Sequence, residues 1–181
     1  MTILNPSLLV AAANAFVGLG EDGMDNRGQM VELFLREVRQ PPGQPWCAAF
    51  VHHVGYWSHY DHKDGRSSWP LPATASCYEL GEFARVRAVL RKEPTVGNVF
   101  LSYSHQYRRF AHTGIVVAVE KSLPVAGGDT LHICTTVEGN TNADGSREGR
   151  LTLRKTRRFS TEHGDRFIHW PDLEQRALAA A

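Results

Sequence analysis

The chain has 181 residues, of which 42% are hydrophobic and 22% are charged, so it is long enough for one well-packed core but short for two. We therefore expect a single domain over residues 1–181. Lysine and arginine number 20 against 19 aspartate and glutamate residues, and the net charge of +1 gives no broad electrostatic argument for nucleic acid or an anionic membrane as a partner.

The three cysteines, Cys47, Cys77 and Cys134, are odd in number and widely spaced. They form no CxxC pair, which argues against a disulfide scaffold and against a thiolate zinc site. We therefore expect at least one free thiol, no metal and no cofactor.

The apolar stretch from Leu8 to Gly20 has no lysine or arginine before it, whereas secretory leaders carry such charges. We expect a protein made in the cytoplasm without a signal peptide. The stretch is too short to span a membrane, and Leu9, Ala13 and Phe16 recur with helical spacing. It predicts a buried first helix and no membrane insertion.

Three further helices are predicted before the strands begin. Apolar residues at helical spacing indicate one over about residues 26–39, which the "QPPGQP" segment ends. Pro45 introduces the next, in which Cys47 and Phe50 share the inner face. Ser76 and Glu79 form a candidate capping box for a helix that reaches about Arg91.

After these helices the pattern changes to short β-branched or aromatic runs. The runs are "VFLSY", "TGIVVAV", "LHICTTVE", "LTLRK" and "RFIHW", separated by turn segments such as "AGGD" and "NADGSREG". They predict an antiparallel sheet of about five strands, and the Ala-rich end "EQRALAAA" indicates a short helix. Helices first and a meander second give an α+β fold with the N-terminal helices packed on the sheet.

Cys47 is a candidate nucleophile because it occupies the first turn of a predicted helix. The oriented N–H groups and the positive dipole end of that turn stabilise a thiolate. Free cysteine is also among the most buried residue types, so an inward cysteine alone is more often part of the core. A catalytic role therefore requires a partner.

His112 interrupts the most apolar strand candidate and is that partner, because it can face a cleft at the end of the sheet. Glu138 and Asn140 lie two residues apart on the following strand, where either can accept or share the second N–H of the histidine. A cysteine, a histidine and an acid or amide have the roles of a catalytic triad.

The segments "PWCAAFV", "HTGIVVAV" and "EGNTN" with the following "GSREG", in this order, resemble the cysteine, histidine-dependent amidohydrolase/peptidase (CHAP) domains. These domains are papain-like enzymes that cut peptidoglycan. The resemblance covers about residues 8–170, with "EDGMDNRGQMVELFL" upstream and "RFIHW" downstream. Gly97-Asn98 stands where similar domains often carry Gly-Asp, which puts a role for an acid there in doubt but leaves the triad intact.

The resemblance implies a papain-like fold and a cysteine-dependent peptidoglycan hydrolase, either an amidase or an endopeptidase. It implies Cys47 as nucleophile, His112 as general base and acid, and Glu138 as the group that orients His112, with Asn140 as a fourth member or substitute. Trp46, Tyr107 and Arg108 are candidate substrate contacts, because they flank the nucleophile or precede His112 in a basic, aromatic segment.

This activity fits a monomer that reaches the cell wall by delivery into neighbouring cells or by release on lysis. If the protein is a delivered toxin, an immunity or inhibitor protein that covers the cleft is an expected partner. The backbone N–H of Cys47 is one expected donor to the oxyanion, and Gln40 and Gln44 are weaker candidates for a second donor.

Three other functions remain open from the sequence. His52, His53, His59 and His62 cluster with Asp61 and Asp64, as in a metal site, but no HExxH or similar spacing occurs, and we favour solvent-exposed histidines. A cell-wall binding relative without catalysis would tolerate loss of the thiol. The same triad could also serve transpeptidation or deamidation of a protein.

Overall fold

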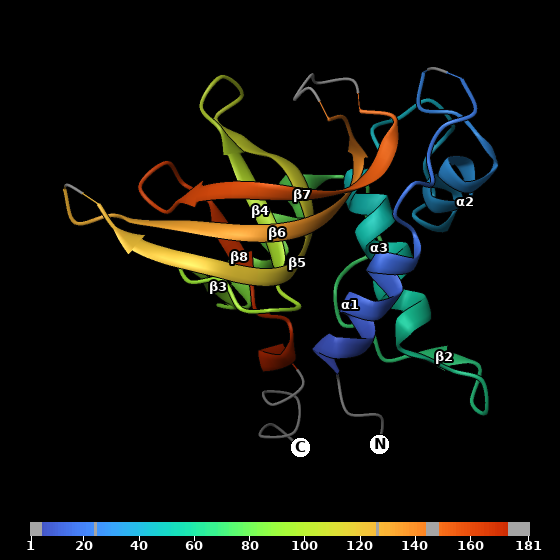
Figure 1. Ribbon diagram of the computed structural model, residues 1–181. Coiled ribbons are helices and arrows are strands. Elements are labelled where there is room, and N and C mark those ends of the chain that lie inside the picture. The colour runs from blue at the N-terminus through green and yellow to red at the C-terminus, as the bar shows by residue number, and fades with distance from the viewer. Residues whose placement is uncertain (1–4, 24, 126, 144–148, 174–181) are drawn as a thin grey trace.

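The computed structural model describes residues 5–23, 25–125, 127–143 and 149–173, and helices precede an antiparallel sheet in it (Figure 1). The helices are α1 (Pro6–Ala15), α2 (Gln29–Glu37), α3 (Cys47–Ser58) and α4 (Cys77–Val86). The strands are β1 (Tyr60–Asp61), β2 (Arg66–Ser67), β3 (Leu90–Arg91), β4 (Val99–Ser104), β5 (Arg109–Pro124), β6 (Thr130–Thr141), β7 (Leu151–Ser160) and β8 (Arg166–Ile168). The predicted α+β class is confirmed. The predicted helix over 174–181 lies outside the described residues.

Local backbone geometry and capping set where the first two helices begin. The Asn5 side chain accepts a hydrogen bond from the Ser7 N–H at 2.9 Å, which caps α1. The second helix begins at Gln29 and not at about residue 26, because Asp25 and Asn26 have φ angles of 72° and 56°. These left-handed angles do not occur inside a right-handed helix.

The fourth helix begins with Ser76 as its cap and ends earlier than predicted. The Ser76 side chain accepts a hydrogen bond from the Glu79 N–H at 3.2 Å. Ala88 adopts a φ of 52°, and the Val89 N–H returns to the Ala84 carbonyl at 3.0 Å. This left-handed closure ends α4 at Val86, and β3 follows instead of further helix.

The main sheet has six strands in the order β3-β8-β4-β5-β6-β7, with antiparallel neighbours throughout. The prediction of about five strands misses β3, whose two residues are too few to give an alternating pattern. The meander from β4 to β7 follows the order of the chain, while β8 returns to pair with β4. Before β4, the Asn98 side chain accepts a hydrogen bond from the Thr95 N–H at 2.8 Å, so this residue shapes a turn.

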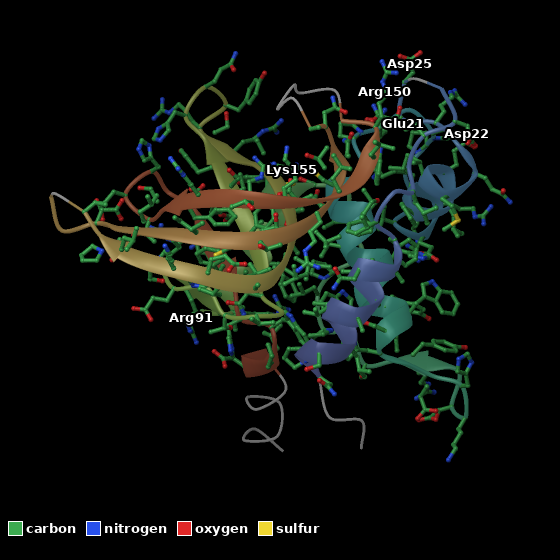
Figure 2. The ribbon with its side chains drawn as sticks, in the orientation of Figure 1. Glu21, Asp22, Asp25, Arg91, Arg150 and Lys155 are labelled. Carbon is green, nitrogen blue, oxygen red and sulfur yellow. The ribbon has the colours of Figure 1, made fainter. Side chains whose placement is uncertain are left out.

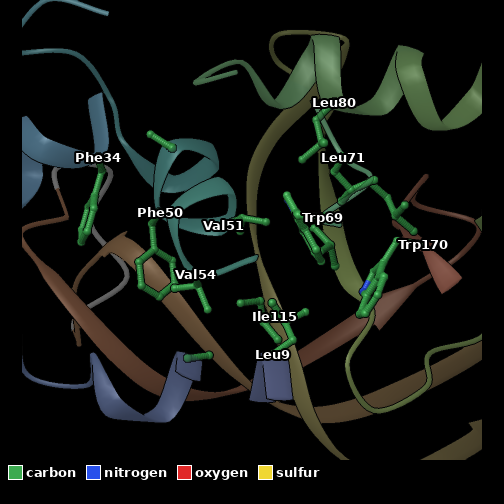
Figure 3. Close-up of a cluster of buried hydrophobic side chains, with 14 of the residues drawn as sticks. Leu9, Phe34, Phe50, Val51, Val54, Trp69, Leu71, Leu80, Ile115 and Trp170 are labelled. Atoms are coloured by element: carbon green, nitrogen blue, oxygen red, sulfur yellow. The ribbon is translucent and has the colours of Figure 1, made fainter. Parts of the chain in front are cut away.

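One face of the sheet packs against the helices, and Figure 1 shows α1, α2 and α3 gathered on that side. In Figure 3, Val51 and Val54 of α3 lie with Leu9 of α1 and Ile115 of β5 in one buried cluster. Each fully buried large apolar side chain contributes about 1.5–3 kcal/mol to folding. This cluster therefore fixes α3, and with it Cys47, against the sheet.

The opposite face of the sheet carries a smaller buried cluster, which includes Phe100, Val116, Phe159 and Phe167. The rings of Phe159 on β7 and Phe167 on β8 lie 5.1 Å apart, although three strands separate β7 from β8 in the sheet. The sheet is therefore strongly curled. Because side chains alternate along a strand, residues spaced by two from Val116 on β5 share this second face.

Among the described residues, no helix has both the length and the apolar character that crossing a membrane requires.

Candidate active site

Cys47 is the first residue of α3, as the helical spacing predicts. Its side chain is only 4% exposed, and it lines a cavity of about 560 Å³. The first N–H groups of a helix have no partner within the helix and form the positive end of its dipole. The start of α3 therefore presents the sulfur to the cavity in surroundings that favour a thiolate.

His112 on β5 and Glu138 on β6 lie together beside this sulfur. The distance from His112 Nε2 to Glu138 Oε2 is 2.8 Å, and His112 also hydrogen-bonds with Cys47. Because Glu138 engages Nε2, Nδ1 is the ring nitrogen that remains for the sulfur. The structure thus brings the three predicted residues together as a hydrogen-bonded chain from Cys47 through His112 to Glu138. In this chain Glu138 is placed to orient the imidazole.

Arg157 on β7 holds the other side of the Glu138 carboxylate, and the sequence reasoning missed it. Arg157 donates through Nε to Oε1 at 2.7 Å and through a terminal nitrogen to Oε2 at 2.5 Å. Thr136 donates its hydroxyl to Oε1 at 2.6 Å. The available signal was strand alternation, because Arg157 lies two residues before the buried Phe159 and so shares its face.

The pKa of the Cys47 thiol lies well below its usual range. The largest cause is a hydrogen bond with Cys77, whose sulfur is 3.5 Å from the Cys47 sulfur. Burial opposes the negative charge, while the hydrogen bond and positive charge of His112 and the Ala48 N–H stabilise it. The pKa of Cys77 is raised by the same contact and by burial, so Cys77 is the thiol donor and Cys47 the thiolate.

Cys77 has no role in the sequence-based site, yet its placement repeats that of Cys47. It is the first residue of α4, directly after the cap residue Ser76. A cysteine immediately after a helix cap was the signal that could have marked it. The first residues of α3 and α4 thus bring their two sulfurs into contact.

The partly buried His112 and the fully buried Glu138 carry opposite charges that stabilise each other. Burial disfavours the imidazolium, but hydrogen bonds with Cys47 and Glu138 and their negative charges raise the pKa of His112 to about 9. Burial would likewise raise the pKa of Glu138, but Arg157 and His112 hold it well below its usual range. The four charges therefore alternate in sign from thiolate to guanidinium, and this alternation offsets the cost of their burial.

Asn140 makes its contacts at the start of α3. When its amide oxygen is oriented toward Trp46, it accepts a hydrogen bond from the Trp46 N–H at 3.1 Å, and its nitrogen donates to Asn26 Oδ1 at 3.3 Å. The expected two-residue alternation with Glu138 fails because the β6–β7 pairing shifts register between Glu138 and Thr141, and Asn140 has a φ of 54°. Asn140 lines the cavity and supports the start of α3, whereas Glu138 orients His112.

Trp46 belongs to the core, which corrects the expectation that its side chain contacts substrate. Its side chain is fully buried, and its ring packs beside those of Phe34 and Phe50. Its indole N–H donates to the Glu21 carboxylate at 3.2 Å. Figure 2 shows Glu21 beside Arg150 at the beginning of β7. The direction of the α3 start thus depends on contacts with the segment before α2.

The segment before His112 reaches the cavity through Tyr107 and Arg109, while Arg108 is not among its lining residues. Arg108 has a φ of 51° and is exposed in the turn between β4 and β5. Because the chain turns at Arg108, the arginine that lines the cavity is the next residue, Arg109. The Arg109 guanidinium lies 6.0 Å from the centre of the Tyr107 ring.

The histidine cluster after Cys47 consists partly of core residues, so the expectation of solvent-exposed histidines is wrong for two of them. His53 is 6% exposed and lies 2.7 Å from the Glu37 carboxylate. His59 is 2% exposed, and its ring packs against those of Trp69 and Trp170. Within the described ranges, no three histidine, cysteine or acidic residues are grouped as metal ligands.

Two glycines allow the site to close. A Cβ on Gly139 would lie 2.6 Å from the Trp46 ring and 2.7 Å from Phe50, so only glycine lets the start of α3 rest on β6. A Cβ on Gly114 would lie 2.9 Å from the Glu138 side chain and 2.7 Å from the Val137 carbonyl. These contacts place the sulfur and the carboxylate within reach of His112.

The cavity walls are polar and carry both signs of charge. Figure 2 shows Lys155 on β7, which lines the cavity together with Arg109 and Arg157. The start of α4 contributes Tyr78 and Glu79. The segments before α3 contribute Asn26, Gln40 and Gln44 to the cavity lining. The cavity can therefore contact carboxylates, amides and a backbone amide group at once.

Comparison of the chain with family models, with curated proteins and with solved structures finds no match.

Proposed function

We propose that this protein is a cysteine-dependent amide hydrolase that cuts the peptide part of peptidoglycan through a thioester intermediate. The observation that carries the proposal is the line of Cys47, His112 and Glu138, with the sulfur and imidazole on one cavity. The order of the motifs and their resemblance to CHAP domains supply the substrate class. A papain-like fold belongs to the same proposal.

In the first half-reaction, the Cys47 thiolate attacks the carbonyl carbon of the scissile amide. The imidazolium of His112 then gives its proton to the departing amine, which breaks the carbon–nitrogen bond and leaves a thioester. In the second half-reaction, His112 takes a proton from water, which hydrolyses the thioester. Glu138 keeps the ring oriented through both steps.

The developing oxyanion needs fixed donors, and the Cys47 N–H at the start of α3 is the first candidate. Gln40 and Gln44 both line the cavity, which supports their role as candidates for a second donor. Loss of one such donor costs about 10²–10³-fold in rate. The Gln44→Ala and Gln40→Ala variants would therefore differ strongly if only one of the two glutamines serves.

The cavity suits a peptide that carries carboxylates. Arg109 and Lys155 line the cavity and supply positive charge, and guanidinium groups pair well with carboxylates. Tyr107 and Tyr78 are exposed aromatic residues on the rim, which suit the apolar faces of sugars or alanine methyl groups. These features support a stem peptide near its attachment to the glycan.

The proposed setting is the cell wall, reached by delivery into a neighbouring cell or by release on lysis. An immunity or inhibitor protein would act by covering the cavity at Cys47. Product analysis separates hydrolysis from the transpeptidation or deamidation that the same residues could perform, because only hydrolysis adds water at the cut bond.

The test is mass spectrometry of fragments released from purified peptidoglycan. We expect the wild-type protein to release fragments that end at one defined amide bond. We expect Cys47→Ala to release none, because the nucleophile is absent. Cys134→Ala is the matched control, because Cys134 belongs to the second core cluster, the smaller buried cluster on the opposite face of the sheet. Equal release by Cys47→Ala and wild type would falsify the proposal.

A further inference from the structure

We propose that Cys47 and Cys77 form an oxidation site, in which hydrogen peroxide converts the two cysteines into a reversible disulfide. The two sulfurs are 3.5 Å apart, and both cysteines are free. They are separated by 30 residues in the sequence and come together because α3 and α4 begin at the same place. The proposed oxidation does not depend on the peptidoglycan reaction.

The two sulfurs are placed so that a bond can form with little movement. A disulfide bond is about 2.05 Å long, so the sulfurs must approach each other by roughly 1.5 Å. Cys47 and Cys77 pack with Ala48 and Phe110 in one small buried cluster. Both cysteines also line the cavity, which gives a small oxidant a route to them.

The protonation of the pair suits stepwise oxidation, because one sulfur is a thiolate and the other a thiol. The hydrogen bond with Cys77 lowers the pKa of Cys47, and the same contact raises the pKa of Cys77. The thiolate is the form that reacts with peroxides. Cys47 is therefore oxidised first, and Cys77 is the thiol that resolves it.

The reaction balances in two steps. The Cys47 thiolate attacks one peroxide oxygen, an S–O bond forms, the O–O bond breaks, and the hydroxide released takes a proton to become water. The Cys77 sulfur then attacks the Cys47 sulfur, an S–S bond forms, and the S–O bond breaks. The departing hydroxide leaves as water with the Cys77 proton. Two thiols lose two electrons, and the peroxide is reduced to two waters.

The disulfide would remove the nucleophile from His112 and protect it from irreversible oxidation to the sulfinic acid. A dithiol reductant would restore it. Cys134 offers a contrast within the same chain, since burial raises its pKa to about 11 and it lies in the second core cluster. It should stay reduced under the same treatment.

The experiment treats the full-length protein with a small excess of hydrogen peroxide and follows its intact mass. We expect a loss of two hydrogens, a Cys47–Cys77 cross-link in the peptide map and full reversal by dithiothreitol. Cys134→Ala should give the same result. In Cys77→Ser, Cys47 should instead gain oxygen and progress to a form that dithiothreitol does not reverse.

A wild-type protein that gains oxygen on Cys47 without forming the cross-link would overturn the proposal, as would a cross-link that involves Cys134. The activity readout, loss of fragment release after peroxide and recovery after dithiothreitol, rests on the proposed function. A cross-link in a protein without peptidoglycan activity would count against that function and leave the oxidation site standing. Release that persists while the cross-link is complete would refute Cys47 as nucleophile.

Discussion

In the part of the chain that the structure describes, two histidine–glutamate pairs each have one buried member, and their difference shows what distinguishes a catalytic pair from a packing pair. His112 and Glu138 lie 2.8 Å apart, and His53 and Glu37 lie 2.7 Å apart. In each pair the carboxylate accepts further hydrogen bonds, from Arg157 and Thr136 for Glu138 and from the Trp57 indole for Glu37. In both pairs, therefore, a carboxylate is held by a histidine and by at least one further donor.

The surroundings of the two imidazoles separate the pairs. The His53 ring lies 4.6 Å from the ring of Phe34 and 5.3 Å from that of Phe16, so it is packed as a core side chain. His112 lines a cavity and meets the Cys47 sulfur on its other side. A histidine oriented by a glutamate can therefore serve packing or catalysis, and the open side with a nucleophile decides between them.

The same substitution in both carboxylates gives the largest expected contrast. Glu138→Gln should lower kcat/KM for peptidoglycan by about 10³-fold or more, because the amide no longer balances the imidazolium or fixes its tautomer. Glu37→Gln should change kcat/KM by only a few-fold. Circular dichroism checks that both variants are folded. Equal losses of activity in two folded variants would remove the distinction between the pairs.

Removal of the further donor to each carboxylate should give the next largest contrast, which we expect in stability. Arg157→Met leaves the fully buried Glu138 carboxylate with His112 as its only charged partner, so we expect a loss of about 3 kcal/mol in the free energy of unfolding. Trp57→Phe, at a half-exposed position, should cost about 1 kcal/mol. Urea unfolding measures both values. The exposed Arg158 supplies the control, and Arg158→Met should stay within about 0.5 kcal/mol of wild type.

The pH dependence should show the smallest contrast. Because the pKa of His112 is raised to about 9, the imidazolium persists through neutral pH, and kcat/KM should fall as the pH rises through about 9. Glu138→Gln should move this limb to lower pH, since the carboxylate helps to raise the pKa. Glu37→Gln should leave the limb in place. A limb that is unmoved in Glu138→Gln would assign it to another group.

The raised pKa of His112 also makes the stability of the fold depend on pH. The folded protein binds the His112 proton more tightly than the unfolded chain, whose reference pKa is 6.5. The resulting stabilisation is fully present below pH 6.5 and is lost as the pH rises through about 9. Thermal unfolding across this range should therefore show a decline that is smaller in Glu138→Gln.

The sequence predicted the parts of the site that depend on local pattern. Helical spacing after Pro45 placed Cys47 at the start of α3, and the apolar run around His112 predicted its strand. Their order along the chain was enough to suggest a common site. Local pattern failed at Asn140 and Arg108, where left-handed residues and a register shift interrupt regular alternation.

Contacts between distant segments were beyond the reach of local pattern. Strand alternation in the "RKTRRF" run places Arg157 on the face of Phe159, but only the curled sheet brings it to the Glu138 carboxylate. Cys77 gains its importance only because two helices begin side by side. Trp46 was predicted to contact substrate and His53 to be exposed to solvent, but the packing of α2 against α3 buries them.

By itself, the sequence determined the helices-then-sheet order, the helix that begins at Cys47 and the three residues proposed for catalysis. These follow from spacing along the chain, which sets hydrogen bonding and burial within a single element. Tertiary structure alone decided that Glu138 and not Asn140 orients His112, and that Arg157 and Cys77 complete the site. Those choices depend on strand register, sheet curl and helix packing, which join atoms that the sequence leaves far apart.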